Sequence, residues 1–423
     1  EYVDWVSINH ELSAVPVLEM LKPDVFVKGS DYASPEDDIT GKITLERDAV
    51  ERNGGRLVFT EDITFSSSAL INDHLDVFDT PLKNYLDKIK KRVGAGEIFE
   101  LLDSVKDYKV LVVGDAIVDE YRYVQSMGKV SKENIIATRA VGRELFAGGV
   151  FAAANHVSNI CAHVEVITSL GGMDSYLETI ENGLNDNIVL NPFLREGVPT
   201  TRKCRFVDPD TLAKLFEVYH FEDRPPEKNF QSRIDECIAE RVSNFDLVLV
   251  TDFGHGLIAD STIKILNEGS RFLAVNTQTN SANSGFNLIT KYPQADYYCI
   301  DEPEARLATG NQFGIIEDVG AEALPQIVKC EKFIITHGRH GCITFETDRE
   351  PTSIPAFTKS VIDTVGAGDA FLAVTSPLVA AGGSMELVGL VGNATGAIKV
   401  GIVGHRKSIQ KQSLLKYITT LLK

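Results

Sequence analysis

The chain has 423 residues and a formal net charge of −18, and 43% of its residues are hydrophobic and 24% charged. This length exceeds the size at which a single hydrophobic core stops growing, so we expect two domains. The acidic charge disfavours nonspecific binding to nucleic acid, and no stretch of about eighteen apolar residues could span a membrane. We therefore expect a soluble enzyme that binds neither nucleic acid nor membranes.

The cysteines and the start of the chain suggest where the protein works. Its six cysteines are scattered without a Cys-x-x-Cys pair, which predicts neither a disulfide framework nor a zinc site. We therefore expect a cytoplasmic protein. Residues 1–10 show no signal-peptide pattern and do not begin with Met, which suggests that a preceding segment is missing.

The first part of the chain, residues 1–79, alternates strand and helix patterns. Its predicted elements are a strand, a helix and a second strand, at residues 23–29, 39–53 and 55–60. Residues 80–107 have a helical period with a basic face, which Gly94 and Gly96 interrupt. We interpret them as a helical linker.

The remaining residues, 108–423, alternate strands with helices and predict a larger parallel α/β domain. The predicted strands are 109–113, 164–168, 246–251, 271–275, 297–300, 332–336 and 342–345. Residues 121–145 and 199–222 do not fit this order, and we expect them to protrude from the sheet.

Residues 363–371 read Asp-Thr-Val-Gly-Ala-Gly-Asp-Ala-Phe and carry the most specific pattern in the chain. Gly366 and Gly368 allow a tight turn, and the apolar run that follows begins a helix whose N-terminus attracts anions. The N–H groups of Ala367, Gly368 and Asp369 can stabilise a phosphoryl group while Asp369 takes a proton from a sugar hydroxyl. The alternative is an ordinary glycine-rich loop with Asp369 as a helix cap.

Residues 108–423 resemble the ribokinase-like, or PfkB, carbohydrate kinases, because several motifs occur in the family's order. Val-Val-Gly-Asp at 112–115 with Asp119, and Ala-Gly-Gly at 147–149 with Asn155, are similar to the family's sugar-binding motifs. The resemblance implies that Asp115, Asp119, Gly148, Gly149 and Asn155 bind the sugar. The alternative for the glycines is a turn before a helix at 150–159.

The same resemblance implies an ATP site with Mg²⁺. Thr-His-Gly-Arg-His-Gly at 336–341 is similar to a turn near the ATP phosphates and ribose, and Asp-Glu-Pro-Glu at 301–304 is similar to Asn-x-x-Glu, whose glutamate organises Mg²⁺ through water. The implied nucleotide-binding residues are Glu304, Thr336, Gly338, Gly341 and, against adenine, Asn393. Asp301 departs from the family's Asn and makes the site more negative. Asn393 could instead be an ordinary polar residue of a helix.

Within this family the chain most resembles the heptose 7-phosphate kinases that also carry a heptose 1-phosphate nucleotidyltransferase and make ADP-heptose for lipopolysaccharide precursors. Thr-Arg-Lys-Cys-Arg at 201–205 is similar to their lid, and Lys203 and Arg205, two apart in a strand, share a face on which one dianion could bind. The alternative is a solvated edge strand. The lid implies a homodimer. Gln278 and His255 replace two lysines of the family pattern, which removes fixed positive charge.

Residues 1–79 resemble the back half of a cytidylyltransferase-like nucleotidyltransferase. The similar strings are Leu-Lys-Pro-Asp-Val-Phe-Val-Lys-Gly-Ser-Asp-Tyr at 21–32 and Phe-Ser-Ser-Ser-Ala-Leu-Ile at 65–71. Lys28, Ser66 and Ser67 could hold a triphosphate, or the serines could simply cap a helix. The family's His-x-Gly-His motif is absent, so we expect no nucleotidyl transfer from this part.

The sequence thus predicts a three-layer α/β/α ribokinase-like domain with a β lid, preceded by a partial Rossmann-like nucleotidyltransferase domain. The predicted activity is an ATP-dependent sugar or sugar-phosphate kinase. One alternative is a bifunctional enzyme whose N-terminal catalytic segment is absent here. The other is a noncatalytic scaffold that binds nucleotide or sugar phosphate.

Overall fold

The computed structural model describes residues 5, 9, 13–29, 43–59, 78–222, 224–358 and 360–422. Its internal contacts group the chain into two compact units, Leu101–Ile409 and Glu1–Glu100 with Gln410–Lys423. The predicted division at residues 79 and 107 stays a prediction. No helix in the described ranges is both long and apolar enough to cross a membrane.

The larger unit is built on a nine-stranded sheet with the order β15-β14-β13-β12-β11-β10-β3-β6-β7. Its strands are β3 (Lys109–Gly114), β6 (His163–Gly171), β7 (Ile188–Arg195), β10 (Leu247–Asp252), β11 (Leu273–Thr277), β12 (Tyr297–Asp301), β13 (Lys332–Thr336), β14 (Cys342–Glu346) and β15 (Thr352–Ile354). Neighbours from β13 to β7 are parallel, and β14 and β15 are antiparallel. The central strands are fully buried apolar runs, as expected for parallel strands covered on both faces.

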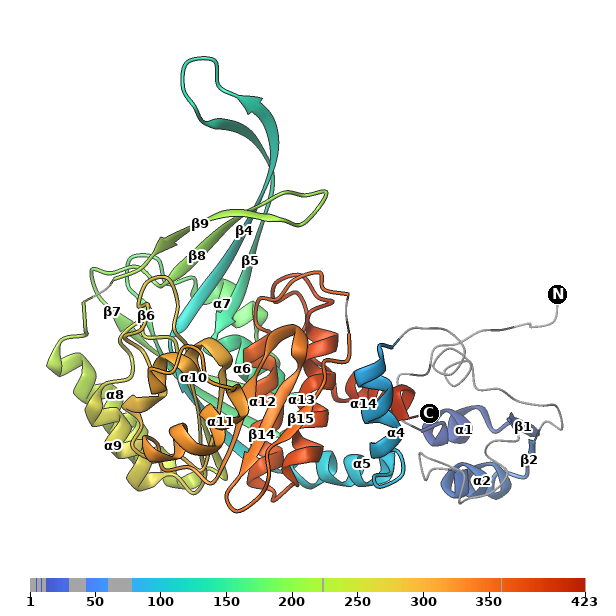
Figure 1. Cartoon of the computed structure of the whole chain (residues 1–423). Helices are drawn as coiled ribbons and strands as arrows, with labels where there is room; N and C mark the ends of the chain where they lie inside the picture. Colours follow the sequence, from blue (N-terminus) through green and yellow to red (C-terminus); the bar gives the residue numbers. More distant parts are fainter. Residues whose placement is uncertain are drawn as a thin grey trace. The chain divides into compact units, whose positions relative to one another are not determined.

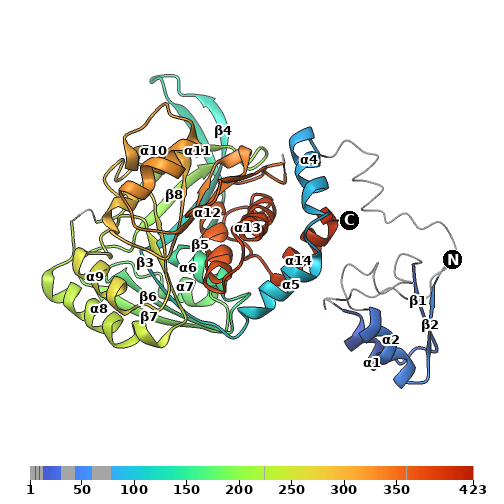
Figure 2. The same ribbon diagram turned by 60° about the horizontal axis from the view of Figure 1, so that its bottom comes forward.

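Helices cover both faces of this sheet, which gives the predicted three layers (Figures 1 and 2). One face packs against α8 (Lys228–Arg241), α9 (Asp260–Gly269) and α10 (Glu302–Thr309), and the other against α6 (Val150–Val157), α12 (Ala367–Ala380) and α13 (Met385–Lys399). Tyr297 of β12 illustrates the second contact, because its hydroxyl lies 2.9 Å from Oγ1 of Thr375. The shorter helices are α7 (Leu177–Gly183) and α11 (Ile316–Asp318).

The protruding segments form a separate four-stranded sheet, the lid, which projects from the large sheet (Figure 1). Its order is β5-β4-β8-β9, with β4 (Ala116–Lys129), β5 (Ile136–Gly149), β8 (Arg202–Val207) and β9 (Lys214–His220). In the parallel β4–β8 pair, Asp119 is level with Lys203 and Tyr121 with Arg205. These four side chains therefore share one face of the lid, because alternate residues of a strand point the same way.

The smaller unit contains a two-stranded parallel sheet of β1 (Val25–Lys28) and β2 (Arg56–Phe59). Its helices include α1 (Val15–Leu21), α2 (Ile43–Arg52), α4 (Thr80–Ile89) and α14 (Lys411–Leu422), and α5 (Ala95–Ser104) spans the boundary between the units. Leu18, Ala49 and Val50 form a small core between α1 and α2. In the larger unit Asn393 lies in α13, which α14 follows in the chain.

Candidate active site

The candidate catalytic turn, residues 363–369, leads into α12. Gly366 caps the helix with φ +74°, and a Cβ there would lie 2.4 Å from Cε1 of His405, so this position requires glycine. The N–H of Ala367 donates to the carbonyl of Thr364 at 3.2 Å, whereas those of Gly368 and Asp369 donate to no group in the described part of the chain. The predicted trio of N–H donors is therefore reduced to two available ones.

Asp369 is buried in the first turn of α12. Burial raises the pKa of its carboxyl; the charges of His405, Lys399 and Lys203 lower it, and Asp119 raises it further. The structure thus brings the predicted base within the electrostatic reach of three cations and a second carboxylate. A carboxyl with a raised pKa is a stronger base once it is ionised, which suits proton abstraction near neutral pH.

Asp119 lies between the side chains of Arg205 and His405. Arg205 donates to its Oδ1, and Nε2 of His405 lies 3.2 Å from its Oδ2. Burial alone would raise the pKa of Asp119, but these two partners hold it below its usual range. Gly148 faces the same carboxylate, because a Cβ at this position would lie 1.9 Å from Oδ2 of Asp119. Arg205 also donates to Glu217 at 2.9 Å, so its guanidinium is already shared between two carboxylates.

Lys203 differs from Arg205 although both were predicted to bind one anion. Its side chain is buried, with 5% exposure, and its Nζ lies 5.4 Å from the ring centre of Tyr219 and 5.8 Å from that of Phe253. No carboxylate or carbonyl of the described residues is within hydrogen-bonding distance of this ammonium. Burial lowers the pKa of Lys203, and the Asp119 charge opposes that effect. A buried ammonium that makes no direct ion pair with the described residues can bind an anionic ligand.

Two other predicted sugar-binding residues have protein partners. Asp115 accepts hydrogen bonds from the N–H groups of Phe253, His255 and Leu257 at 3.0 to 3.1 Å, and so shapes the loop after β10. A Cβ at Gly149 would lie 2.7 Å from the Asp115 carbonyl oxygen.

The side-chain amide of Asn155 is used in a similar way. Its Nδ2 donates to the carbonyl of Gly183 at 2.7 Å, and its Oδ1 accepts from the N–H of Asn185 at 2.9 Å. These contacts join α6 to the segment after α7. The sugar-binding roles of Asp115 and Asn155 stay predictions.

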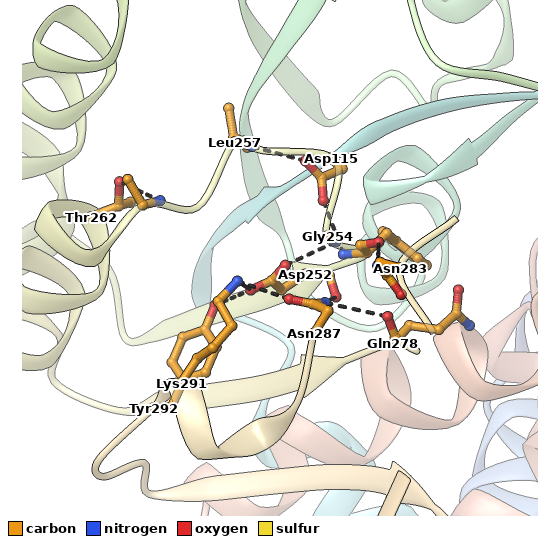
Figure 3. Close-up of polar contacts among 12 residues, drawn as sticks. Asp115, Asp252, Gly254, Leu257, Thr262, Gln278, Asn283, Asn287, Lys291 and Tyr292 are labelled. Carbon is orange, nitrogen blue, oxygen red and sulfur yellow. Dashed lines mark hydrogen bonds and ion pairs between the residues drawn. The ribbon is translucent and has the colours of Figure 1, made fainter. Parts of the chain in front are cut away.

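A lysine that the sequence analysis missed lies at the C-terminal end of β10 (Figure 3). Nζ of Lys291 is 2.7 Å from Oδ2 of the buried Asp252 and 2.8 Å from Oδ1 of Asn287, and the Tyr292 hydroxyl donates to the same Asp252 oxygen. Lys291 follows Asp252 by 39 residues, and no local motif marks it. Its charge is balanced by Asp252, and Asn287 links it to the backbone carbonyl of Gln278.

His255 does not carry the partial charge that was expected near neutrality. Burial, with the neighbouring charge of Lys203, lowers its pKa to about 4, so the imidazole is neutral at pH 7. Its Nε2 has no hydrogen-bond partner among the described residues.

The carboxyl group of Glu304 lies at the start of α10. Its Oε1 accepts from the N–H of Thr279 at 3.0 Å and its Oε2 from that of Asp301 at 2.8 Å, while Asp301 caps the helix in return. Burial and then the charge of Asp301 raise the pKa of Glu304 to about 8. A buried acid with a carboxylate neighbour and no cation bound to it fits a water-bridged Mg²⁺, which would supply the missing charge.

The other predicted nucleotide residues shape the backbone near this end of the sheet. Gly341 has φ +95°, and a Cβ there would lie 2.0 Å from the Ile354 carbonyl oxygen, whereas the space beside Gly338 is open. Thr336 donates to the carbonyl of Ile300 at 3.4 Å. Asn393 donates to the carbonyls of Ile354 and Pro355 at 3.0 and 3.1 Å, which ties α13 to β15. Contact of Asn393 with adenine stays a prediction.

The residues predicted for a triphosphate site in the smaller unit are only partly described. Lys28 forms an ion pair with Glu46 at 2.6 Å, so its charge is balanced within the protein. Ser66 and Ser67 lie outside the described residues. The likeness of this unit to a nucleotidyltransferase therefore stays a prediction.

Comparison with known proteins identifies the family of the larger unit. Residues 107–412 match the family described as pfkB family carbohydrate kinase. The chain belongs to this family.

Solved structures share the fold of the larger unit. A ribokinase of Arabidopsis thaliana, complexed with ribose and ATP, matches with a TM-score of 0.54 and 19% identity. The match covers 75% of this chain and 99% of the ribokinase. Phosphofructokinase-2 of Escherichia coli has a TM-score of 0.58 at 13% identity, with coverages of 74% and 99%. The predicted family and ribokinase-like fold are confirmed.

Curated relatives include proteins named bifunctional protein HldE. That of Rhodopseudomonas palustris strain BisB5 is 26% identical over 305 residues, which are 71% of this chain and 61% of the relative. That of Bradyrhizobium diazoefficiens is 24% identical over 320 residues, with coverages of 72% and 62%. The match therefore spans less than two thirds of these pfkB-family relatives.

Proposed function

We propose that this pfkB-family protein is an ATP-dependent kinase whose acceptor is a sugar phosphate of the heptose 7-phosphate type. The observation that carries the proposal is Lys203, a buried ammonium that makes no ion pair with any described residue and lies within electrostatic reach of Asp369. A neutral sugar needs no such cation, whereas a phosphate on the sugar would pair with it. The likeness to HldE proteins and the lid motif at 201–205 support the same class of acceptor.

In the proposed reaction, Asp369 takes the proton of the attacking sugar hydroxyl as its oxygen bonds to the γ-phosphorus and ADP leaves. The free N–H groups of Gly368 and Asp369 stabilise the charge that develops on the transferred phosphoryl group. Arg205 and His405 keep Asp119 ionised, so that it can accept a hydrogen bond from a sugar hydroxyl. Glu304 would hold Mg²⁺ through water, and the metal would neutralise phosphate charge.

The acceptor is tested by measuring ADP release with heptose 7-phosphate, with the unphosphorylated heptose and with other sugar phosphates. We expect Lys203→Met to raise KM for the sugar phosphate about 10- to 100-fold, because a charge-assisted contact contributes roughly 1.5–3 kcal/mol. KM for ATP should change far less. Lys264→Met on the exposed surface of α9 is the matched control. Equal KM values in wild type and Lys203→Met would refute the sugar-phosphate role.

The scaffold alternative makes a different prediction in the same assay. A scaffold would bind ATP without sugar-dependent ADP release, and calorimetry with ATP alone would detect that binding. The altered residues Asp301 and Gln278 keep this alternative open, because the nearby Lys291 is already paired with Asp252. A bifunctional enzyme would require an N-terminal catalytic segment, which the reading frame upstream of residue 1 would reveal.

We also propose that two copies associate through the lid. Leu215, Phe216 and Val218 of β9 are exposed apolar side chains on this small sheet, and such residues often mark an interface. Light scattering during gel filtration should give the mass of a dimer for the wild type and of a monomer for Phe216→Asp. A monomeric wild type would contradict the proposal.

A further inference from the structure

Lys399, the last residue of α13, has a side chain that the protein encloses completely. Its exposure is 0%, which is rare for lysine unless the ammonium is paired. Nζ donates to the carbonyl oxygens of Val365 at 2.7 Å and of Gly404 at 2.8 Å. Among the described residues no carboxylate forms an ion pair with it, so its direct partners are two backbone carbonyls.

The two carbonyls belong to the two segments that build the catalytic end of α12. Val365 lies in the catalytic turn, and Gly404 precedes His405, which packs on Gly366 and pairs with Asp119. The N–H groups of the same two residues, Val365 and Gly404, donate to Asp363 at 3.1 and 2.8 Å. Asp363 therefore holds their N–H groups, and Lys399 holds their carbonyls.

This paired arrangement fixes both segments relative to each other. The Asp363 carboxylate accepts from the two N–H groups, and the Lys399 ammonium donates to the two carbonyls. Together these contacts fix the backbone at Val365 and Gly404 more strictly than either would alone. Gly366 follows Val365 directly, so the orientation of the Val365 carbonyl sets where the helix begins and where the N–H groups of Gly368 and Asp369 point. The ammonium also lowers the pKa of Asp369 and places a fixed positive charge behind the turn.

We propose that the Lys399 ammonium is a built-in monovalent cation that positions the catalytic turn and loop 401–405 for phosphoryl transfer. This inference rests on the proposed kinase function. Lys399 acts through the turn and touches neither substrate, so it is a positioning residue. If it served only to fill space, a methionine of similar length would replace it without loss. If its charge matters, a shortened side chain should leave a site for a small cation lined by the two carbonyls and faced by Asp363.

The test compares wild type, Lys399→Ala and Lys399→Met in sodium, ammonium and methylammonium chloride at one ionic strength. We expect both variants in sodium to lose on the order of 100-fold in kcat, because oriented donors at a developing charge contribute effects of this size. KM for both substrates should change less. Ammonium should restore kcat of Lys399→Ala at least tenfold but not that of Lys399→Met, whose side chain fills the space. Wild type should respond to no salt.

A second readout does not need kinase activity. Ammonium should raise Tm of Lys399→Ala by about 2 °C or more relative to sodium, because a ligand that binds only the folded state stabilises it. Wild type and the surface control Lys264→Ala should show no such difference. A wild type without kinase activity would refute the proposed function alone, and the Tm shift would still report on the cation site.

Three results would overturn the inference. Wild-type kcat in Lys399→Met would show that the charge is unnecessary. Equal loss in every salt together with an unchanged Tm of Lys399→Ala would show that no cation site exists. If Lys399→Ala fails to fold in sodium and also in ammonium, while Lys399→Met folds and is active, the residue serves packing only.

Discussion

Asp119 on the lid and Glu304 at the start of α10 are both buried carboxyl groups, yet their pKa values shift in opposite directions. Arg205 and His405 lower the pKa of Asp119 against the effect of burial, whereas Glu304 has the carboxylate of Asp301 beside it and a pKa of about 8. The proposed sugar side of the site therefore contains its own counter-charges. The proposed nucleotide side has an acid that no described lysine or arginine pairs with, and a Mg²⁺–ATP complex would be suited to balance it.

The largest effect is expected at the residue between these two sides. Asp369→Asn preserves the shape of the side chain but cannot take a proton, so kcat should fall about 10³-fold or more while Tm stays within a few degrees. Steady-state kinetics and thermal unfolding measure the two quantities. Asp260→Asn, at the exposed start of α9, is the control. A variant with normal kcat would remove Asp369 from its role as base.

The charge balance around Asp119 can be tested by removing Arg205, one of its two partners. Arg205→Met leaves Asp119 and Glu217 without their shared guanidinium, and loss of one partner of a buried ion pair costs about 3–5 kcal/mol. We expect a loss of this size in the free energy of unfolding, measured by urea denaturation at pH 7. Arg224→Met, which removes an exposed arginine paired with Glu222, should change stability by less than about 1 kcal/mol. Similar losses in both variants would show that Asp119 does not depend on Arg205.

The pH dependence of this loss in the free energy of unfolding tests whether the charge of Asp119 causes it. In the wild type the pKa of Asp119 is lowered in the folded state, so its stabilising contribution is present above the unfolded pKa of about 3.8 and disappears as pH falls through the folded value. The difference between wild type and Arg205→Met should therefore shrink in acid. A difference that stays constant down to pH 3 would point to lost packing rather than lost charge.

These contrasts also show what the sequence could predict. Seven strands of the large sheet were predictable because most are buried apolar runs, and their ends differ by a few residues. The two edge strands were missed: β15 has three residues, and Asn191 and Pro192 interrupt the pattern of β7, which an edge strand tolerates. The turn at residues 363–369 and the helix that follows it were predictable because the glycines, the acid and the helix start are adjacent in the chain; its catalytic role stays a prediction.

The partners of the site residues were much harder to predict. Lys203 and Arg205 look equivalent in the sequence, and the contacts of Arg205 with Asp119 and, across the β8–β9 hairpin, with Glu217 distinguish them. Lys291 and Lys399 have no motif, because each is brought to its partners by the packing of distant elements. Asn155, Asn393 and Asp115 were assigned to ligands because they lie in family motifs. In the structure they contact backbone groups, and no sequence pattern marks those contacts, so their ligand roles stay predictions.

At Glu304 the comparison can be tested through pH. A carboxyl group whose pKa is about 8 in the folded state and 4.5 in the unfolded state adds stability that is complete below pH 4.5 and is lost as pH rises through 8. Wild-type stability should therefore fall over this interval, and Glu304→Gln, which cannot ionise, should show a flatter profile. Urea denaturation at pH 5, 7 and 9 measures both curves, and Glu317→Gln on α11 is the control.

Binding of Mg²⁺–ATP should lower the raised pKa of Glu304 in the wild type. A cation near Glu304 favours the ionised carboxylate, so binding at pH 7 should release a proton, and calorimetry in buffers of different ionisation enthalpy would detect it. Glu304→Gln should release less. Equal proton release from the two proteins would show that a group other than Glu304 responds to the nucleotide. The contrast between the pKa values of Asp119 and Glu304 would then not describe the two sides of the site.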